Sequence, residues 1–267
     1  MPRVGDSHRW SSAARTHVGK VRQINEDAVL DRPDLGAWAV ADGLGGHQAG
    51  DTASRMVVDA LTALSPPAEL SEIIAAARHA LIRVNQRLNE MAWDQARSSP
   101  GSTVAALFLR GSQGAAVWAG DSRVYLLRDG WLRRLSRDHS QAEEMIQSGL
   151  LDPQDATNHP ASSVLTRAVG ADEDLELDDF VIDVFPGDAF LLCSDGLYNE
   201  VGEQTITRVL SENDCHSAAD QLLQLALNGE ARDNISAVTV RVEVDPGDSS
   251  KTVINPAFSR RTAKRAT

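Results

Sequence analysis

Cysteine is scarce in this sequence, which has two in 267 residues, Cys193 and Cys215. Cys193 ends the apolar run "FLLC", where a thiol is typically buried as a small hydrophobic group. The pattern favours free thiols and excludes a fold held together by several disulfides.

Long hydrophobic runs are also absent. No run approaches the ~18 residues of a membrane span. The first twenty residues, "MPRVGDSHRWSSAARTHVGK", lack the apolar stretch of a secretory signal. The sequence therefore predicts a cytoplasmic protein with no membrane span.

Basic residues are outnumbered, with 26 Lys and Arg against 38 Asp and Glu, for a net charge of −12. From Pro246 onward five basic residues face one acidic residue, so the segment 246–267 carries +4 and the rest about −16. An acidic body argues against binding of nucleic acid and suits a site for cations. The segment 246–267 is polar and has no hydrophobic period, so we expect a basic, disordered tail.

Apolar runs joined by tight turns dominate the rest of the chain. Turn signals such as Asp129-Gly130 and Pro186-Gly187-Asp188 predict hairpins, and hence mostly antiparallel sheets. The runs predict strands within 27–31, 36–42, 102–110, 114–136, 175–196 and 234–244. Hydrophobic residues with a helical period predict two helix pairs, 51–64 with 70–91 and 203–213 with 217–228.

These elements predict an α+β fold. Two mostly antiparallel sheets with a helix pair for each outer face form a four-layer α-β-β-α sandwich. We expect one domain over 1–245. Within it, 138–163 contains a short helix and polar residues and is expected to form a small flap beside the sheets. We call 138–163 the flap segment below.

A glycine-rich stretch, "DGLGGHQAGD", follows the apolar run "AWAVA". Gly45 to Gly50 has the glycine spacing of a phosphate-binding P-loop. The next residue is Asp51, where that loop has Lys, and a carboxylate there would repel a bound nucleotide. The sequence excludes a P-loop, and Asp51 is typical of an acid at a helix N-terminus.

Acidic residues recur where predicted strands begin or end, beside Gly, Asn or Ser. A single acid of this kind is usually a turn former or helix cap. The whole set suggests carboxylates that converge at one end of a sandwich and need a cation to offset their repulsion. Oxygen ligands favour Mg²⁺ or Mn²⁺, and the lack of closely spaced His or Cys ligands argues against zinc. The residues are Glu26, Asp27, Asp42, Asp121, Asp195 and Asp233.

Eight motifs follow one another along the chain: "VRQINEDA", "VADGLGGHQAG", "GSTVAAL", "AGDSRVYLLRDG", "LSRDHS", "LTRAVG", "FLLCSDGL" and "ARDNISAVTV". In this order they resemble the metal-dependent Ser/Thr protein phosphatases of the protein phosphatase 2C family, in their compact bacterial form. The resemblance runs from about Arg15 to about Val244.

The resemblance implies an enzyme with two core Mn²⁺ or Mg²⁺ ions. Asp42 would bridge both ions, and Asp195 and Asp233 would complete the shell of one. The other would be held by the Gly43 carbonyl together with Glu26 or Asp27, an alternative that the two adjacent acids leave open. Asp121 matches a ligand of a third ion in bacterial members, with Asp195 shared.

Two further residues are expected to act on the substrate. Arg22 matches the phosphate-binding arginine of the family, with a surface salt bridge as the alternative. Animal-type members have a His directly after the DG pair, where this chain has Leu44. His47, in the same loop, is the candidate general acid. The alternative is that His47 only hydrogen-bonds the loop and that metal-bound water donates the proton.

The implied function is hydrolysis of phosphoserine and phosphothreonine by metal-activated water without a phosphoenzyme, opposing a Ser/Thr kinase in bacterial signalling. The expected partners are that kinase and its protein substrates, and the expected state is a monomer. A non-catalytic regulatory domain of the same fold and a small-molecule phosphatase stay open as alternatives.

A cysteine-based phosphatase is excluded, because Asn199 and Gln221 stand where it would need Arg six residues after a cysteine. No G-x-S-x-G sequence surrounds Ser194, which argues against a serine hydrolase.

Overall fold

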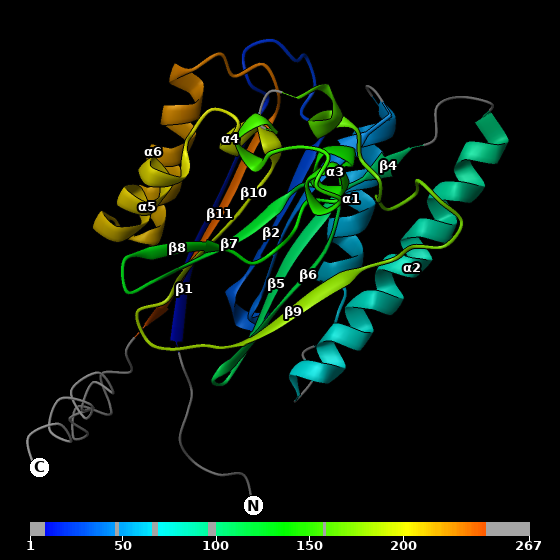
Figure 1. Cartoon of the computed structure of the whole chain (residues 1–267). Coiled ribbons are helices and arrows are strands. Elements are labelled where there is room, and N and C mark those ends of the chain that lie inside the picture. The colour runs from blue at the N-terminus through cyan, green and yellow to red at the C-terminus, as the bar shows by residue number, and fades with distance from the viewer. Residues whose placement is uncertain (1–8, 46–47, 66–68, 96–99, 157–158, 244–267) are drawn as a thin grey trace, which may run out of the picture.

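The computed structural model describes residues 9–45, 48–65, 69–95, 100–156 and 159–243. They form two antiparallel sheets between two pairs of helices (Figure 1). One sheet has the order β1-β11-β10-β7-β8, and the other has the order β2-β3-β5-β6-β9 with β4 paired to β3. The predicted four-layer sandwich is confirmed.

The elements have the following bounds. The first sheet contains β1 (Arg9–His17), β7 (Arg123–Arg128), β8 (Trp131–Arg134), β10 (Ala189–Cys193) and β11 (Ile235–Glu243). The second contains β2 (Asp27–Arg32), β3 (Ala37–Leu44), β4 (Gly101–Ser102), β5 (Val104–Arg110), β6 (Gln113–Ala119) and β9 (Asp178–Asp183). The helices are α1 (Gln48–Thr62), α2 (Leu70–Gln95), α3 (Gln141–Gln147), α4 (Asp195–Tyr198), α5 (Glu203–Glu212) and α6 (Cys215–Asn228).

The hydrophobic core has three layers, one between the two sheets and one between each sheet and its helix pair. The central strands are therefore buried on both faces. In β3, Trp38 and Val40 lie in the cluster between the two sheets, whereas Ala39 and Ala41 belong to the cluster under α1 and α2. Successive side chains of a strand point to opposite faces, so "AWAVA" covers both layers. A third cluster joins the other sheet to α5 and α6. Cys193 and Cys215 are buried free thiols, as predicted.

Two parts of the strand prediction were incomplete or wrong. The predicted strands do not include β1, whose polar sequence "RWSSAARTH" lacks a hydrophobic alternation. β1 pairs along its whole length with β11. The runs around Pro186–Asp188 do form strands, but they do not form a hairpin. β9 pairs with β6 in one sheet and β10 pairs with β7 and β11 in the other, so the turn carries the chain between the sheets.

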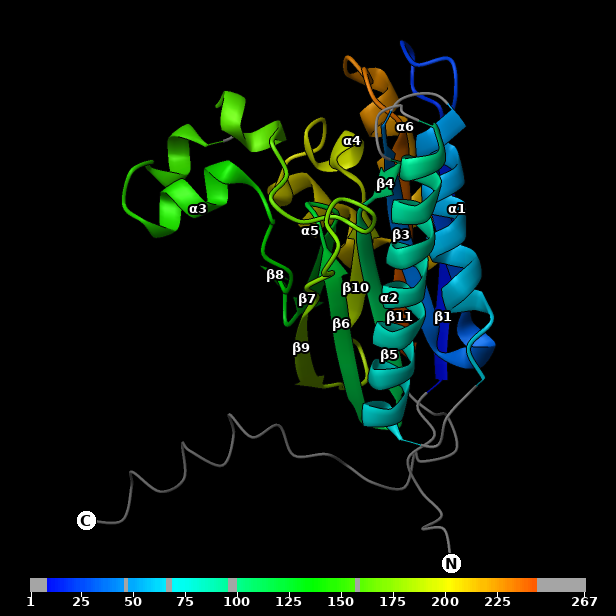
Figure 2. The ribbon, with the colours of Figure 1, turned by 90° about the vertical axis from the view of Figure 1, so that its right-hand side faces the viewer.

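The flap segment stands beside the sandwich (Figure 2). It contains α3 and two short 3-10 helices, Pro153–Asp155 and Pro160–Ser163. Ser140 caps α3, and its side chain accepts a hydrogen bond from the Glu143 N–H. Within the described residues, no helix combines the length and apolarity needed to cross a membrane.

Candidate metal centre

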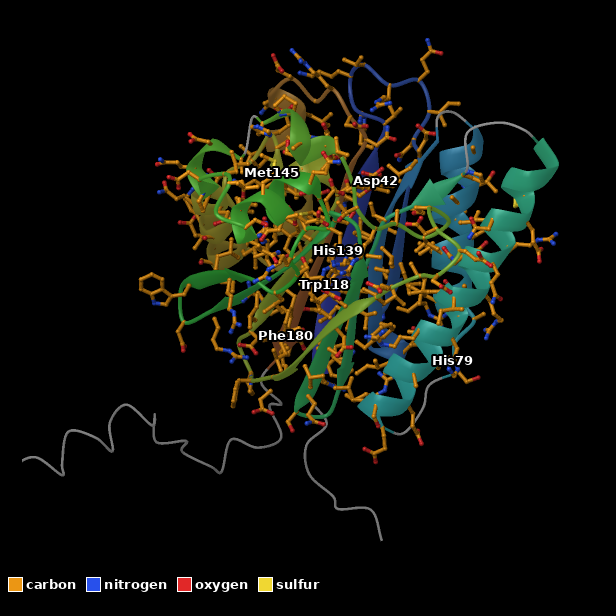
Figure 3. The ribbon with its side chains drawn as sticks, turned by 45° about the vertical axis from the view of Figure 1, so that its right-hand side comes forward. Asp42, His79, Trp118, His139, Met145 and Phe180 are labelled. Atoms are coloured by element: carbon orange, nitrogen blue, oxygen red, sulfur yellow. The ribbon has the colours of Figure 1, made fainter. Side chains whose placement is uncertain are left out.

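Five aspartates lie at one end of the two sheets. Asp27 begins β2 and Asp42 lies near the end of β3, and the two are register partners. Asp121 lies in the turn between β6 and β7, Asp195 begins α4 after β10, and Asp233 precedes β11. Because antiparallel strands alternate in direction, the first residues of some strands and the last residues of their neighbours lie at the same end of the sandwich. We call the five aspartates the acid cluster, and Figure 3 labels Asp42 near the upper ends of the strands.

Burial and mutual repulsion raise the pKa values of this cluster. Burial, followed by the charges of the other four members, raises the pKa of Asp42 well above the usual carboxyl value. Burial raises the pKa of Asp27 to about 7, with the charge of Asp195 adding to the effect. Burial and the charge of Asp195 likewise raise the pKa of Asp121 to about 7, and burial and the charge of Asp233 raise that of Asp195 to about 6. The cluster is an unfavourable arrangement of charges unless a cation offsets them.

The donor set fits divalent cations. Oδ1 of Asp27 and Oδ1 of Asp195 are buried and have no hydrogen-bond partner, and a buried acceptor without a partner costs stability unless something else binds it. Among the described residues, no three His, Cys, Asp or Glu side chains are grouped closely enough to hold an ion as they stand. The carboxylates therefore lie at the same end of the sheets and repel one another, but they are farther apart than the ligands of a bound ion. Carboxylate oxygens are the ligands that Mg²⁺ and Mn²⁺ prefer.

The glycines of the "DGLGGHQAGD" stretch permit a close backbone approach. A Cβ at Gly43 would lie 2.2 Å from the Gly50 carbonyl oxygen, and a Cβ at Gly50 would lie 2.5 Å from Oε1 of Glu26. The start of α1 is thereby held against the end of β3, beside Asp42. Asp51 lies in the first turn of α1, as predicted, and pairs with Arg55 at 2.6 Å.

Sequence reasoning missed four polar residues that position the acids. The Ser194 hydroxyl donates to Oδ2 of Asp27 at 2.8 Å. Oγ1 of Thr103 accepts from the Asp42 N–H at 3.0 Å and lies 2.7 Å from Oγ of Ser122. Asn234 is the fourth. Three of the four directly adjoin a predicted acid in the quoted motifs, and this adjacency was the available signal.

Asn234 fixes the loop between β1 and β2, which carries Arg22. Its Oδ1 accepts from the Glu26 N–H at 2.8 Å, and its Nδ2 donates to the carbonyls of Val18 and Ile24 at 2.9 and 3.0 Å. A Cβ at Gly196 would lie 2.0 Å from the Asn234 carbonyl oxygen, so α4 also approaches this residue closely.

Asn234→Ala is expected to lower the free energy of unfolding by about 2–4 kcal/mol, because three hydrogen bonds are lost and buried groups are left without partners. Urea denaturation measures the change. The matched control is Asn89→Ala on the exposed side of α2, which removes one bond to the Asp172 carbonyl and should cost under about 1.5 kcal/mol. Equal losses for the two variants would contradict this role of Asn234.

The remaining predicted site residues are placed as follows. Arg22 is half-exposed, and its Nη2 donates to Oδ2 of Asp233 at 2.8 Å, so it lies at the acid cluster in an ion pair. Glu26 is buried with its carboxylate against the start of α1. His47 lies outside the described residues.

A cavity of about 740 Å³ adjoins the acid cluster. Glu143 and Ile146 of α3 line it from the flap segment, and Glu203 lines it from the start of α5. Asp121 and Asp195 also line it, so the cavity connects the flap segment with the acids. Its size is in the range of ligand-binding cavities.

The chain matches a known family in its sequence. A sequence model described as protein phosphatase 2C matches residues 15–230. The chain belongs to the protein phosphatase 2C family. The resemblance inferred from the eight motifs is confirmed.

Relatives within the protein phosphatase 2C family include proteins of known structure. The Mycobacterium tuberculosis serine/threonine protein phosphatase PstP is 34% identical over 231 residues, which are 86% of this chain but 44% of PstP, so the chain spans less than half of that relative. The structure of PppA, a key regulatory component of T6SS in Pseudomonas aeruginosa, has a TM-score of 0.82 and 43% identity, covering 87% of this chain and 97% of PppA. The catalytic domain of PstP, solved in complex with two manganese ions, has a TM-score of 0.80 and 32% identity, covering 89% and 100%.

Proposed function

We propose that this chain is a metal-dependent protein phosphatase that hydrolyses phosphoserine and phosphothreonine in proteins. The acid cluster carries the proposal. In a chain of the protein phosphatase 2C family, it sets Asp27 directly opposite Asp42 and brings Asp195 and Asp233 to the same edge of the sheets. The manganese ions bound to the PstP domain support Mn²⁺ or Mg²⁺ as the cofactor.

The acid cluster would hold the cations. Asp42 would bridge two of them, Asp195 and Asp233 would complete the shell of one, and the Gly43 carbonyl with Glu26 or Asp27 would hold the other. Asp121 would hold a third ion together with Asp195. When bound, the ions would lower the pKa of a water molecule and offset the charge of the phosphate.

Arg22 would bind and orient the phosphate group. Its guanidinium pairs with Asp233 and is half-exposed. A cation at Asp233 would compete for the carboxylate and leave the N–H donors of Arg22 to two phosphate oxygens. This contact places the phosphorus at the acid cluster and stabilises negative charge as it develops in the transition state.

The leaving oxygen of serine or threonine must gain a proton, and we propose His47 as the donor. A p-nitrophenolate leaving group needs little acid help, whereas a serine or threonine alkoxide needs much. His47→Gln is therefore expected to slow phosphopeptide turnover at least about 10-fold more than turnover of p-nitrophenyl phosphate. Steady-state kinetics on both substrates measure the ratio. Equal losses would assign His47 to the loop structure, and no loss would remove it from the mechanism.

The proposed function is tested with a panel of substrates in the presence of Mn²⁺. We expect phosphate release from phosphoserine and phosphothreonine peptides. Release from p-nitrophenyl phosphate alone would instead indicate a small-molecule phosphatase. No release from any substrate, in protein shown by calorimetry to bind Mn²⁺, would indicate a non-catalytic domain of the same fold.

We also propose the cellular setting of the chain. The catalytic domain would span 1–245 and act as a cytoplasmic monomer that opposes a Ser/Thr kinase. Phosphoproteomics of a deletion strain beside an Asp42→Asn strain would identify the substrates, and the same phosphosites should rise in both.

The basic tail, 246–267, lies outside the described residues. Truncation after Asp245 should leave turnover of p-nitrophenyl phosphate unchanged if the tail is not part of the domain.

A further inference from the structure

Arg123, at the start of β7, has a largely buried guanidinium with a hydrogen-bond partner at each of its three nitrogens. Its Nη2 donates to Oδ2 of Asp138 at 2.6 Å, and its Nε lies 3.1 and 3.2 Å from the two oxygens of that carboxylate. Its Nη1 donates to the Tyr125 hydroxyl at 3.1 Å, and its central carbon lies 3.5 Å from the centre of the Tyr198 ring. The side chains of Arg123 and Asp138 are 19% and 10% exposed.

These partners come from separate parts of the candidate site. Asp138 is the first residue of the flap segment, and Tyr198 is the last residue of α4, whose first residue is Asp195. Arg123 itself follows Asp121 by two residues. One side chain therefore contacts both the root of the flap segment and the helix that carries an acid of the cluster.

The ion pair extends into the flap helix. Nη1 of Arg134 lies 3.3 Å from Oδ2 of Asp138, and Nη2 of Arg134 lies 3.4 Å from Oε2 of Glu143 on α3. Burial opposes the charge of Arg123, but the hydrogen bonds to Asp138 raise its pKa above the usual arginine value, so the guanidinium stays charged. Lysine cannot reproduce this contact, because it lacks the planar fork that binds a carboxylate at two points and stacks on a ring.

The other end of β7 provides a matched control. Nε and Nη2 of Arg128 donate to the two oxygens of Asp188 at 2.8 and 2.7 Å, and its central carbon lies 4.7 Å from the centre of the Phe185 ring. Arg128 thus repeats the chemistry of Arg123 at the end of the strand remote from the acid cluster.

We propose that Arg123 is a positioning residue that couples the flap segment to the cation sites, by holding Asp138 and α4 in one arrangement. This inference rests on the proposed function, because it concerns the cations that the acid cluster would bind. With Arg123 in place, Asp121 and Asp195 keep their relative positions and the flap segment is fixed beside them. Without it, a cation would have to order α4 and the flap root as it binds.

The test compares Arg123→Lys with Arg128→Lys in the full chain. The rise in melting temperature during an Mn²⁺ titration reports cation binding without the need for turnover. Arg123→Lys should need about 10-fold more Mn²⁺ to reach half of its maximal rise, the usual scale for residues that orient metal ligands. Arg128→Lys should lose a similar amount of thermal stability but stay within about 2-fold of the wild type in Mn²⁺ requirement. Hydrogen exchange in α3 should accelerate only in Arg123→Lys.

Equal Mn²⁺ requirements for the two variants, or unchanged exchange in α3 of Arg123→Lys, would overturn the proposal. If Arg123→Lys does not fold, Tyr198→Leu replaces it, since that variant removes the ring contact and keeps the ion pair. It should shift the Mn²⁺ requirement in the same direction, and no shift would overturn the proposal. A wild type that binds Mn²⁺ but hydrolyses no phosphopeptide would overturn the proposed function and leave this titration readable.

Discussion

Asp42→Asn is expected to lower turnover of a phosphothreonine peptide at least about 10³-fold, which corresponds to about 4 kcal/mol of transition-state stabilisation. The variant keeps the shape of the side chain and removes the charge that would bridge two cations. In the metal-free protein the same change should raise the melting temperature. Burial and the other four aspartates raise the pKa of Asp42, so its ionised form destabilises the fold. Loss of activity with a gain in stability distinguishes a functional charge from a structural one.

The control for this variant is Asp51→Asn. Asp51 lies near Asp42 in the sequence, but its carboxylate pairs with Arg55 and it is not part of the acid cluster. Its replacement should leave turnover within about 2-fold of the wild type, since an exposed ion pair contributes little. Comparable losses of turnover in the two variants would refute the bridging role of Asp42.

Removal of divalent cations is expected to abolish turnover, and added Mn²⁺ should restore it. The physical reason is that the candidate site is dominated by clustered carboxylates, so bound cations are needed to offset both their charge and that of a phosphate ester. Assays with and without excess chelator measure the effect. Full turnover in excess chelator would refute a metal-dependent mechanism.

Chelation should also make thermal stability depend on pH. The pKa values of Asp27 and Asp121 are raised to about 7 in the fold, against about 4 in an unfolded chain. As the pH falls through 7, the fold binds protons that the unfolded chain does not, so stability rises toward lower pH. We expect a higher melting temperature at about pH 6.5 than at about pH 8. Burial lowers the pKa of His139, so this residue acts in the opposite direction at the lower end of the window.

Saturation with Mn²⁺ is the control for the pH effect. Bound cations keep the carboxylates ionised, so the difference in melting temperature between the two pH values should shrink. If the melting temperature in excess chelator stays constant or falls as the pH is lowered to 6.5, the raised pKa values are contradicted.

The layers of this fold were predicted well from the sequence, because helices and strands with a buried face show a characteristic spacing of hydrophobic residues. It failed where stability comes from long-range pairing. β1 has few apolar residues, and its register with β11 joins residues more than two hundred positions apart. The Pro186–Asp188 turn was recognised, but a local signal does not specify which sheet each flanking strand enters.

In the candidate site, too, local features were predicted and long-range contacts were not. Asp42, Asp195 and Asp233 were predicted from their positions at strand ends, and the structure places them at one edge. The contacts that hold them were not predicted, because Thr103 and Ser194 reach Asp42 and Asp27 across the tertiary fold. The place of His47 is a prediction from the sequence alone.

The pairing of β1 with β11 brings the two ends of the described domain together. Arg9 begins β1 and is the register partner of Glu243, which ends β11. Figure 1 shows the start of β1 at the lower end of the sheet, away from the acid cluster. A short linker between these two positions would close the described domain into a ring. New termini opened in an exposed turn, such as Asp129-Gly130, would then give a circular permutant with its sheets intact. The same geometry allows a further domain to be fused beyond either position without covering the face where a phosphoprotein would bind.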